Sequence, residues 1–270
     1  MNFLLEPLTY AFMQRGLLAG TMVGILCAVI GTYVVLRGMA FLGDALAHAI
    51  LPGVAIAYLF GGNLLLGALV AAVVVAVGIG YFSRQGTIKE DTAIGILFAA
   101  ALSLGVAMIS SIRTYAVDLS HILFGNVLGV SPTDLWLTAG LGLAVLLTVF
   151  LLYRPFMVIS FDPVLAATLR LPTELLRNIM LILLAVTIVV SLQTVGVGLG
   201  AAMLVTPAAT AYLLTKRLSS MMLVSAGLGA LSSIVGLYIS YYLNIVSGSA
   251  IVLTATAIFM IVFWVKRGKR

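Results

Sequence analysis

The stretch GMAFLGDALAHAILPGVAIAYLF, residues 38–60, is apolar over most of its length and yet contains Asp44 and His48. As a helix it is about 34 Å long at 1.5 Å per residue, which is enough to cross the hydrocarbon of a bilayer. An ionised side chain in lipid costs several kcal/mol, so polar residues inside a span indicate function. The stretch therefore predicts a membrane-spanning helix with a polar site near its middle.

The composition of the whole chain is that of an integral membrane protein. Of the 270 residues, 63% are hydrophobic and 8% are charged, and the mean hydropathy is +1.26. Soluble domains carry about 25% charged residues. The 14 basic and 8 acidic side chains of this chain are too few to cover a soluble protein of its size. The apolar runs are about twice as long as the roughly 10-residue strands of membrane barrels, so we predict an all-α, polytopic bundle of membrane helices.

We expect eight or nine membrane-spanning helices in a single domain, residues 1–270. The hydrophobic segments are 16–36, 38–60, 63–82, 92–111, 133–153, 177–194, 196–215, 220–242 and 247–265. The seventh is rich in glycine and follows the sixth with almost no loop, so eight full spans plus a broken one fit equally well. Residues 1–15 lack the basic region and the cleavage site of a signal peptide and are predicted to form an interfacial helix.

Basic residues between the spans predict the orientation in the membrane. If the spans alternate, one side receives Arg37, Arg84, Lys89, Arg154, Arg170, Lys216, Arg217 and the terminal KRGKR. Short loops rich in Lys and Arg face the cytoplasm, so this side is predicted to be cytoplasmic. The outer side receives Glu6 and residues 61–63, 112–131 and 244–248. Because the basic residues are scattered or follow the last span, they do not indicate nucleic-acid binding.

Asp44 and His48 are four residues apart and therefore share one face of a helix. Pro52 has no N–H to donate to the carbonyl of residue 48, so we expect a freed backbone oxygen beside the imidazole. Carboxylate, imidazole and carbonyl groups are ligands of first-row divalent metals. A neutral hydrogen bond between helices and a proton relay are two other interpretations of the pair.

The loop 154–176 is long enough to do more than connect two spans. We predict an extended start, a short helix and an exit, with Asp162 as the cap and Pro163 in the first turn, where a missing N–H costs nothing. A capped helix between spans suggests a docking element on the cytoplasmic side. A surface linker is the alternative.

Other polar signals are weaker. Asp118 and His121 in the outer loop could cap a short re-entrant helix, or could form a vestibule that collects cations. Residues 88–95, IKEDTAIG, place Glu90 and Asp91 at the positive end of the fourth span. The glycines of GVGLGAAM, 196–203, do not match a dinucleotide fingerprint and instead favour close helix packing.

Sequence signals of catalysis are lacking. The chain contains no GxxxxGK[ST] run, so it has no phosphate-binding loop for ATP. Nothing in it resembles a catalytic triad, and we do not expect an enzyme. Cys27 is the single cysteine and cannot form a disulfide within the chain.

Five stretches resemble, in order, the permease subunits of the manganese/zinc/iron ABC importer family. They are VLRGMAFLGDALAHAILPGVAIAYL, EDTAIGILFAAALSLGVAMIS, VDLSHILFGNVLGVS, SFDPVLAATL and TVGVGLGAAMLVTPAATAYLLT. The similarity runs from about residue 10 to the last span, and its most specific part is GDA-x-x-H-x-x-x-PG at 43–53.

The resemblance implies a type II importer-like fold in a bacterial plasma membrane. It further implies a homodimer, two cytoplasmic ATPase subunits docked at the coupling loop 154–176, and an extracytoplasmic metal-binding protein. The cargo would be manganese, zinc or iron held at Asp44 and His48, without a permanently bound cofactor. The segment DALAHAILPG is closest to manganese-type members, whereas Arg170 stands where glycine is expected. A proton-coupled secondary transporter that uses Asp44 and His48 as its relay is the alternative function.

Overall fold

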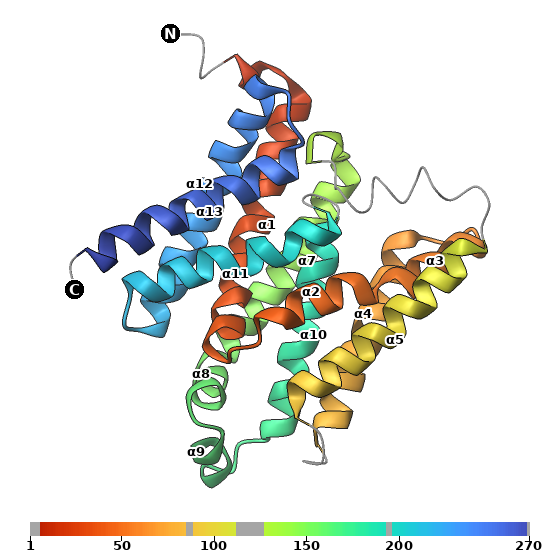
Figure 1. Cartoon of the computed structure of the whole chain (residues 1–270), viewed down its shortest axis with the longest axis vertical. Helices are drawn as coiled ribbons and strands as arrows, with labels where there is room; N and C mark the ends of the chain where they lie inside the picture. Colours follow the sequence, from red (N-terminus) through yellow and green to blue (C-terminus); the bar gives the residue numbers. More distant parts are fainter. Residues whose placement is uncertain (1–5, 85–88, 112–126, 193–195, 269–270) are drawn as a thin grey trace.

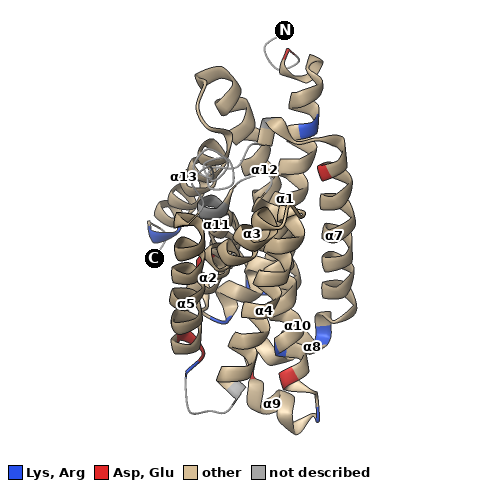
Figure 2. Ribbon diagram, turned by 90° about the vertical axis from the view of Figure 1, so that its right-hand side faces the viewer, with Lys and Arg blue, Asp and Glu red and all other residues tan. Residues whose placement is uncertain are grey.

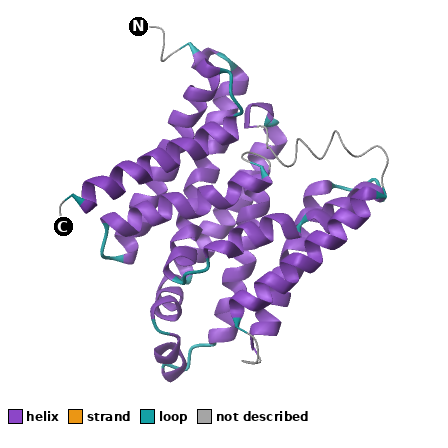
Figure 3. Cartoon of the chain, viewed as in Figure 1, coloured by secondary structure: helices purple, strands orange, loops and turns teal. Residues whose placement is uncertain are grey.

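The chain is a bundle of helices in the residues that the computed structural model describes, 6–84, 89–111, 127–192 and 196–268 (Figures 1 and 3). No strand occurs in these ranges. The α-helices are α1 (Ala11–Leu36), α2 (Ala40–Ala49), α3 (Leu51–Leu59), α4 (Leu64–Arg84), α5 (Glu90–Ser110), α7 (Pro132–Leu151), α8 (Tyr153–Phe161), α9 (Pro163–Thr168), α10 (Thr173–Leu192), α11 (Val197–Leu214), α12 (Leu218–Leu243) and α13 (Ser247–Arg267). Two short 3-10 helices, η1 (Pro7–Thr9) and η2 (Val127–Gly129), complete the set. The all-α prediction is confirmed.

Eight stretches of the described residues are long and apolar enough to cross a membrane, and α2 and α3 together form one of them, Ala40–Leu59. The glycine-rich α11 is a shorter apolar helix that follows Gly196, which has a positive φ of 88°. Eight full spans plus one shorter helix is one of the two arrangements that the sequence predicts.

The first helix begins earlier than predicted. α1 starts at Ala11, so residues 11–15 belong to the same 26-residue helix as the first span and not to a separate interfacial helix. Only Pro7–Thr9 forms a helical turn of its own before it. Nε of Arg15 donates to the carbonyl of Ala11 one turn back along this helix.

α1 occupies the centre of the bundle, in contact with α7, α10, α11 and α12 (Figure 1). In its apolar window 72% of the residues are buried, against 17% in α5 and in α7. The outer faces of α5 and α7 therefore remain available to lipid or to another protein chain.

Small residues bring several helices into close contact. Gly31 of α1 lies against the carbonyl of Leu204 in α11, and a Cβ at Gly31 would overlap that oxygen. Gly53 of α3 and Gly67 of α4 face each other in the same way. Lipid gives no hydrophobic drive for helix association, so close van der Waals packing at such residues takes its place.

The predicted cytoplasmic ends lie on one side of the molecule. Leu36, Phe161, Thr215 and Lys266 line one cavity, which brings together the ends of α1, α8, α11 and α13. Charged residues are sparse along the helices and lie near their ends (Figure 2). The grouping of the basic loops is the one that the positive-inside rule predicts.

Candidate metal site

Asp44 and His48 both lie on α2, and the helix ends directly after them. α2 stops at Ala49, Ile50 forms a turn, and α3 begins at Leu51 with Pro52 in its first turn. Proline lacks an N–H and its ring collides with the preceding turn of a helix, so it is tolerated only at a helix start. The helical hydrogen bonding of the span is thus interrupted at Ile50, two residues beyond His48, although Ile50 keeps a helical backbone conformation.

The two side chains form a local pair. Nδ1 of His48 lies 3.0 Å from the backbone oxygen of Asp44 and 3.6 Å from Oδ1 of the same residue. With its proton on Nδ1, the imidazole donates to that carbonyl and turns the lone pair of Nε2 outward. The partner of one ring nitrogen decides which nitrogen binds a metal, so Nε2 is the candidate ligand atom.

The backbone around Pro52 bears on the carbonyl oxygen of His48. Pro52 has no N–H to donate to this oxygen, and the N–H that approaches it is that of Ile50, only two residues along the chain. In a helical backbone such a short contact is too bent to replace the regular helical hydrogen bond, so the freed carbonyl oxygen stays a prediction. The C-terminal end of α2 still carries the partial negative charge of its helix dipole, which favours a cation beside His48.

α5 packs across the broken span and holds the site in place. The ring of Phe98 meets His48 edge to face, with centroids 6.0 Å apart. Gly105 lies against Leu51 and Pro52, and any side chain at this position would strike the break. α5 therefore fixes both the imidazole and the turn that follows it.

The pair is accessible in the single chain. The side chain of Asp44 is 42% exposed and that of His48 is 27% exposed, at the depth of a membrane span. A carboxylate at such depth must face protein or a watery cavity. Within the residues that the structure describes, no group of three or more His, Cys, Asp or Glu side chains could hold a metal ion.

A second polar cluster lies at the cytoplasmic end of α1 and α5. Nη2 of Arg37 is 3.4 Å from Oε2 of Glu90, and both side chains are largely buried. Burial lowers the pKa of the Arg37 guanidinium, the charge of Glu90 opposes this shift, and nearby Arg177 adds to it. Arg177 in turn donates to the carbonyl of Gly80 in α4 at 2.8 Å.

The sequence predicts Glu90 at a helix terminus, and the structure adds its pairing with Arg37. Glu90 and Asp91 do occupy the first turn of α5, as predicted, but neither side chain caps the helix with a hydrogen bond. Both Arg37 and Glu90 end spans on the same predicted side, and this is the signal that could have suggested the pair. Asp118 and His121 lie outside the described residues.

The loop 154–176 contains the predicted capped helix. Asp162 Oδ1 accepts the N–H groups of Val164 and Leu165, each at 2.9 Å, and Pro163 opens α9. The start of the loop is helical and not extended as expected. Pro155 fits the first turn of α8, and the buried side chains of Phe156 and Ile159 anchor the helix on the bundle.

Arg170 takes the place of the expected glycine and adopts its conformation. Its φ is 55°, in the left-handed region. The N–H of Arg170 donates to the carbonyl of Ala167 and that of Leu171 to the carbonyl of Ala166. This pair of bonds is the Schellman ending of a helix, which usually has glycine at the left-handed position. α9 therefore ends in the backbone conformation that glycine favours, with Arg170 in its place at some cost in backbone strain.

The fold and the site define a transporter permease, and the comparisons with known proteins agree. The chain matches the ABC 3 transport family over residues 9–266 and belongs to that family. It is 49% identical to the manganese transport system membrane protein MntC of Halalkalibacterium halodurans, over 96% of this chain and 89% of the relative. It is 40% identical to a probable iron transport system membrane protein of Haemophilus influenzae, over 96% of each chain.

The fold is also that of a solved structure. A structure described as PsaBC from Streptococcus pneumoniae in complex with Fab superposes with a TM-score of 0.86 at 40% identity. The match covers 97% of this chain and 94% of the other. The chain is thus a multi-pass membrane protein and an ABC importer permease in both sequence and fold.

Replacing Glu90 by Gln should destabilise the cytoplasmic end of the bundle, because Arg37 would keep its charge and lose its partner. We expect a loss of about 1–3 kcal/mol, typical of a hydrogen bond to a charged group. Thermal unfolding in detergent measures it. Asp91→Asn is the matched control, since it removes the same charge from the same helical turn at an exposed position. Equal losses in the two variants would show that only attraction to the helix terminus is involved.

Proposed function

We propose that the chain is the permease subunit of an ATP-driven importer of divalent transition metals in the bacterial plasma membrane, with manganese as the cargo. The observation that carries the proposal is the Asp44–His48 pair at the break between α2 and α3, in a chain of the ABC 3 transport family. Residues 1–270 act as one permease domain. The metal is a passing substrate and not a resident cofactor, and an extracytoplasmic metal-binding protein delivers it.

Manganese is the favoured cargo for two reasons. The candidate ligands are oxygen and nitrogen atoms without sulfur, a set that suits manganese(II). The manganese relative is 49% identical to this chain and the iron relative 40%. Zinc and iron(II) accept the same ligand types, so a competition assay among the three metals distinguishes them.

ATP hydrolysis belongs to partner subunits that dock at 154–176. The chain has no phosphate-binding loop, and α9 projects from the cytoplasmic end of the bundle (Figure 1). Val164 is 78% exposed, Leu169 57% and the preceding Phe161 62%. Exposed apolar side chains on a short, rigidly capped helix favour a protein interface.

A homodimer would complete the metal site. Each copy contributes one carboxylate and one imidazole, which is too few for an ion that has lost most of its water. Two copies related by a two-fold axis would supply four side-chain ligands around one pore. Two carboxylates also neutralise a dication and so lower the cost of holding it within the membrane. The accessibility of Asp44 and His48 in the single chain supports this arrangement.

Uptake by the reconstituted complex tests the function. Proteoliposomes that contain the permease and its ATPase should accumulate manganese only with ATP, and uptake should survive collapse of the proton gradient. Asp44→Ala and His48→Ala should reduce uptake to background, because each removes a ligand. Loss of uptake on collapse of the gradient would instead favour a proton-coupled transporter. Normal uptake in Asp44→Ala would remove the pair from transport.

The cap of α9 tests the docking role. Asp162→Ala should weaken the helix by roughly 1 kcal/mol, and uptake should fall while the metal affinity of the permease is unchanged. Asp162→Asn keeps the capping oxygen and should retain uptake. Arg170→Gly removes the left-handed strain and should also retain it. Normal uptake after scrambling of residues 161–170 would exclude α9 from the mechanism.

Mixed dimers test the shared site. A dimer of one wild-type copy and one Asp44→Ala/His48→Ala copy should lose nearly all transport, because every pore lacks half its ligands. A mixed dimer with one Asp91→Asn copy is the control and should transport normally. Half-normal uptake at unchanged affinity in the first dimer would mean that each copy has its own path.

A further inference from the structure

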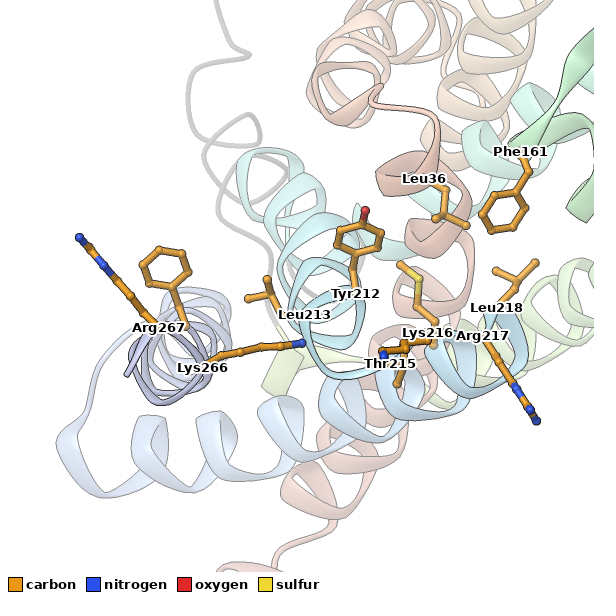
Figure 4. Close-up of a pocket in the computed structure, with 12 residues that line it drawn as sticks. Leu36, Phe161, Tyr212, Leu213, Thr215, Lys216, Arg217, Leu218, Lys266 and Arg267 are labelled. Atoms are coloured by element: carbon orange, nitrogen blue, oxygen red, sulfur yellow. The ribbon is translucent and has the colours of Figure 1, made fainter. Parts of the chain in front are cut away.

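A cavity of about 590 Å³ opens where the cytoplasmic ends of α1, α8, α11 and α13 meet (Figure 4). Its walls combine two kinds of side chain. Leu36, Leu218, Met221 and Phe263 are apolar, whereas Lys216, Arg217, Lys266 and Arg267 are cationic. The proposed metal path uses neither set, and the cavity shares one lining residue, Phe161, with the proposed docking surface that α9 carries.

The cationic side chains have no acidic neighbour in the cavity. No Asp or Glu is among the residues that line it. None of the four cations forms an ion pair with a carboxylate in the part of the chain that the structure describes. Four positive charges around one apolar hollow repel each other and attract an anion from the surroundings.

The cavity lies at the level of the lipid headgroups. Trp264 is 63% exposed near the cytoplasmic end of α13, the position where tryptophan marks the membrane boundary. The guanidinium of Arg267 lies 5.9 Å from the Trp264 ring centroid. The basic residues of the cavity therefore belong to the headgroup layer, and its apolar wall faces the start of the acyl chains.

The side chains around the cavity point in different directions. Lys266 extends from α13 toward the turn between α11 and α12, whereas the guanidinium ends of Arg217 and Arg267 extend away from it on opposite sides (Figure 4). An anion in the cavity would therefore meet Lys266 and the residues of the α11–α12 turn. The two arginines are placed to contact neighbouring headgroups.

We propose that this cavity binds the headgroup of an anionic glycerophospholipid of the cytoplasmic leaflet. The phosphate would lie between Lys266 and Lys216, and the glycerol and first methylenes would lie against Phe263, Leu36 and Leu218. Basic pockets between membrane helices on the cytoplasmic side bind such lipids by this combination of charge and apolar contact. A bound lipid would bridge α13 to the α11–α12 turn and hold the last helices together.

The test uses purified permease in detergent, without ATPase or metal. Lipid binding is then measured independently of the proposed transport function. Phosphatidylglycerol should raise the thermal unfolding temperature, and phosphatidylcholine with the same acyl chains should not. Native mass spectrometry should detect retained phosphatidylglycerol. Lys216→Gln/Lys266→Gln should weaken its binding roughly tenfold or more, since each basic residue at an anionic surface contributes about 1 kcal/mol.

Lys89→Gln/Arg154→Gln is the matched control, because it removes the same charge from exposed cytoplasmic positions outside the cavity. It should leave phosphatidylglycerol binding nearly unchanged, and circular dichroism should confirm that both double variants fold. Equal loss in the two double variants would overturn the proposal, as would equal stabilisation by inorganic phosphate. Unchanged lipid binding together with lost ATPase binding in Lys216→Gln/Lys266→Gln would assign the cavity to the ATPase.

Discussion

The break in the second span is the feature on which the rest of the structure depends. A lipid-embedded helix cannot leave backbone groups unpaired, so a proline in its middle requires packing on every side. Here glycine residues let neighbouring helices close around Pro52: Gly105 of α5 lies against Pro52, and Gly53 lies against Gly67 of α4. As a result, Asp44 and His48 lie near the C-terminal end of α2 and not in the middle of an uninterrupted helix.

α5 connects this break with the cytoplasmic end of the molecule. Near its middle, Phe98 contacts the imidazole of His48, and at its first residue Glu90 pairs with Arg37. A cavity of about 270 Å³ beside that ion pair is also lined by Pro163 of α9 and by Glu174 of α10. One helix thus touches both the candidate metal site and the surroundings of the candidate docking helix.

Charged side chains are few, and they lie at two kinds of position: within a span and at the cytoplasmic border of the membrane. In the described residues, the carboxylate of Asp44 lies 3.6 Å from the imidazole of His48 within a span, and Arg37 and Glu90 form an ion pair at the predicted cytoplasmic ends of α1 and α5. The remaining cytoplasmic cations at the ends of α11 and α13 stay unpaired by carboxylates in that part of the chain and face the headgroup layer. The proposed lipid site thus uses charge at the cytoplasmic border, and the proposed metal site uses charge in the interior.

The amino-acid sequence by itself determined the class of fold, and it also predicts the sidedness and the candidate ligands. Spans of about 20 apolar residues, basic loops on one side, the spacing of Asp44 and His48 and the cap of α9 by Asp162 can all be read from short segments of the chain, because each depends on neighbouring residues only.

Only the tertiary structure decided how these parts meet. Phe156 and Ile159 turn the expected extended segment into α8 because they find a surface to bury against. Arg37 pairs with Glu90, which lies 53 residues further along the chain. Arg170 adopts a left-handed backbone conformation at the end of α9. Each of these outcomes depends on which groups the fold brings close in space. Hydrophobic periodicity predicts single helices but does not predict such contacts between them.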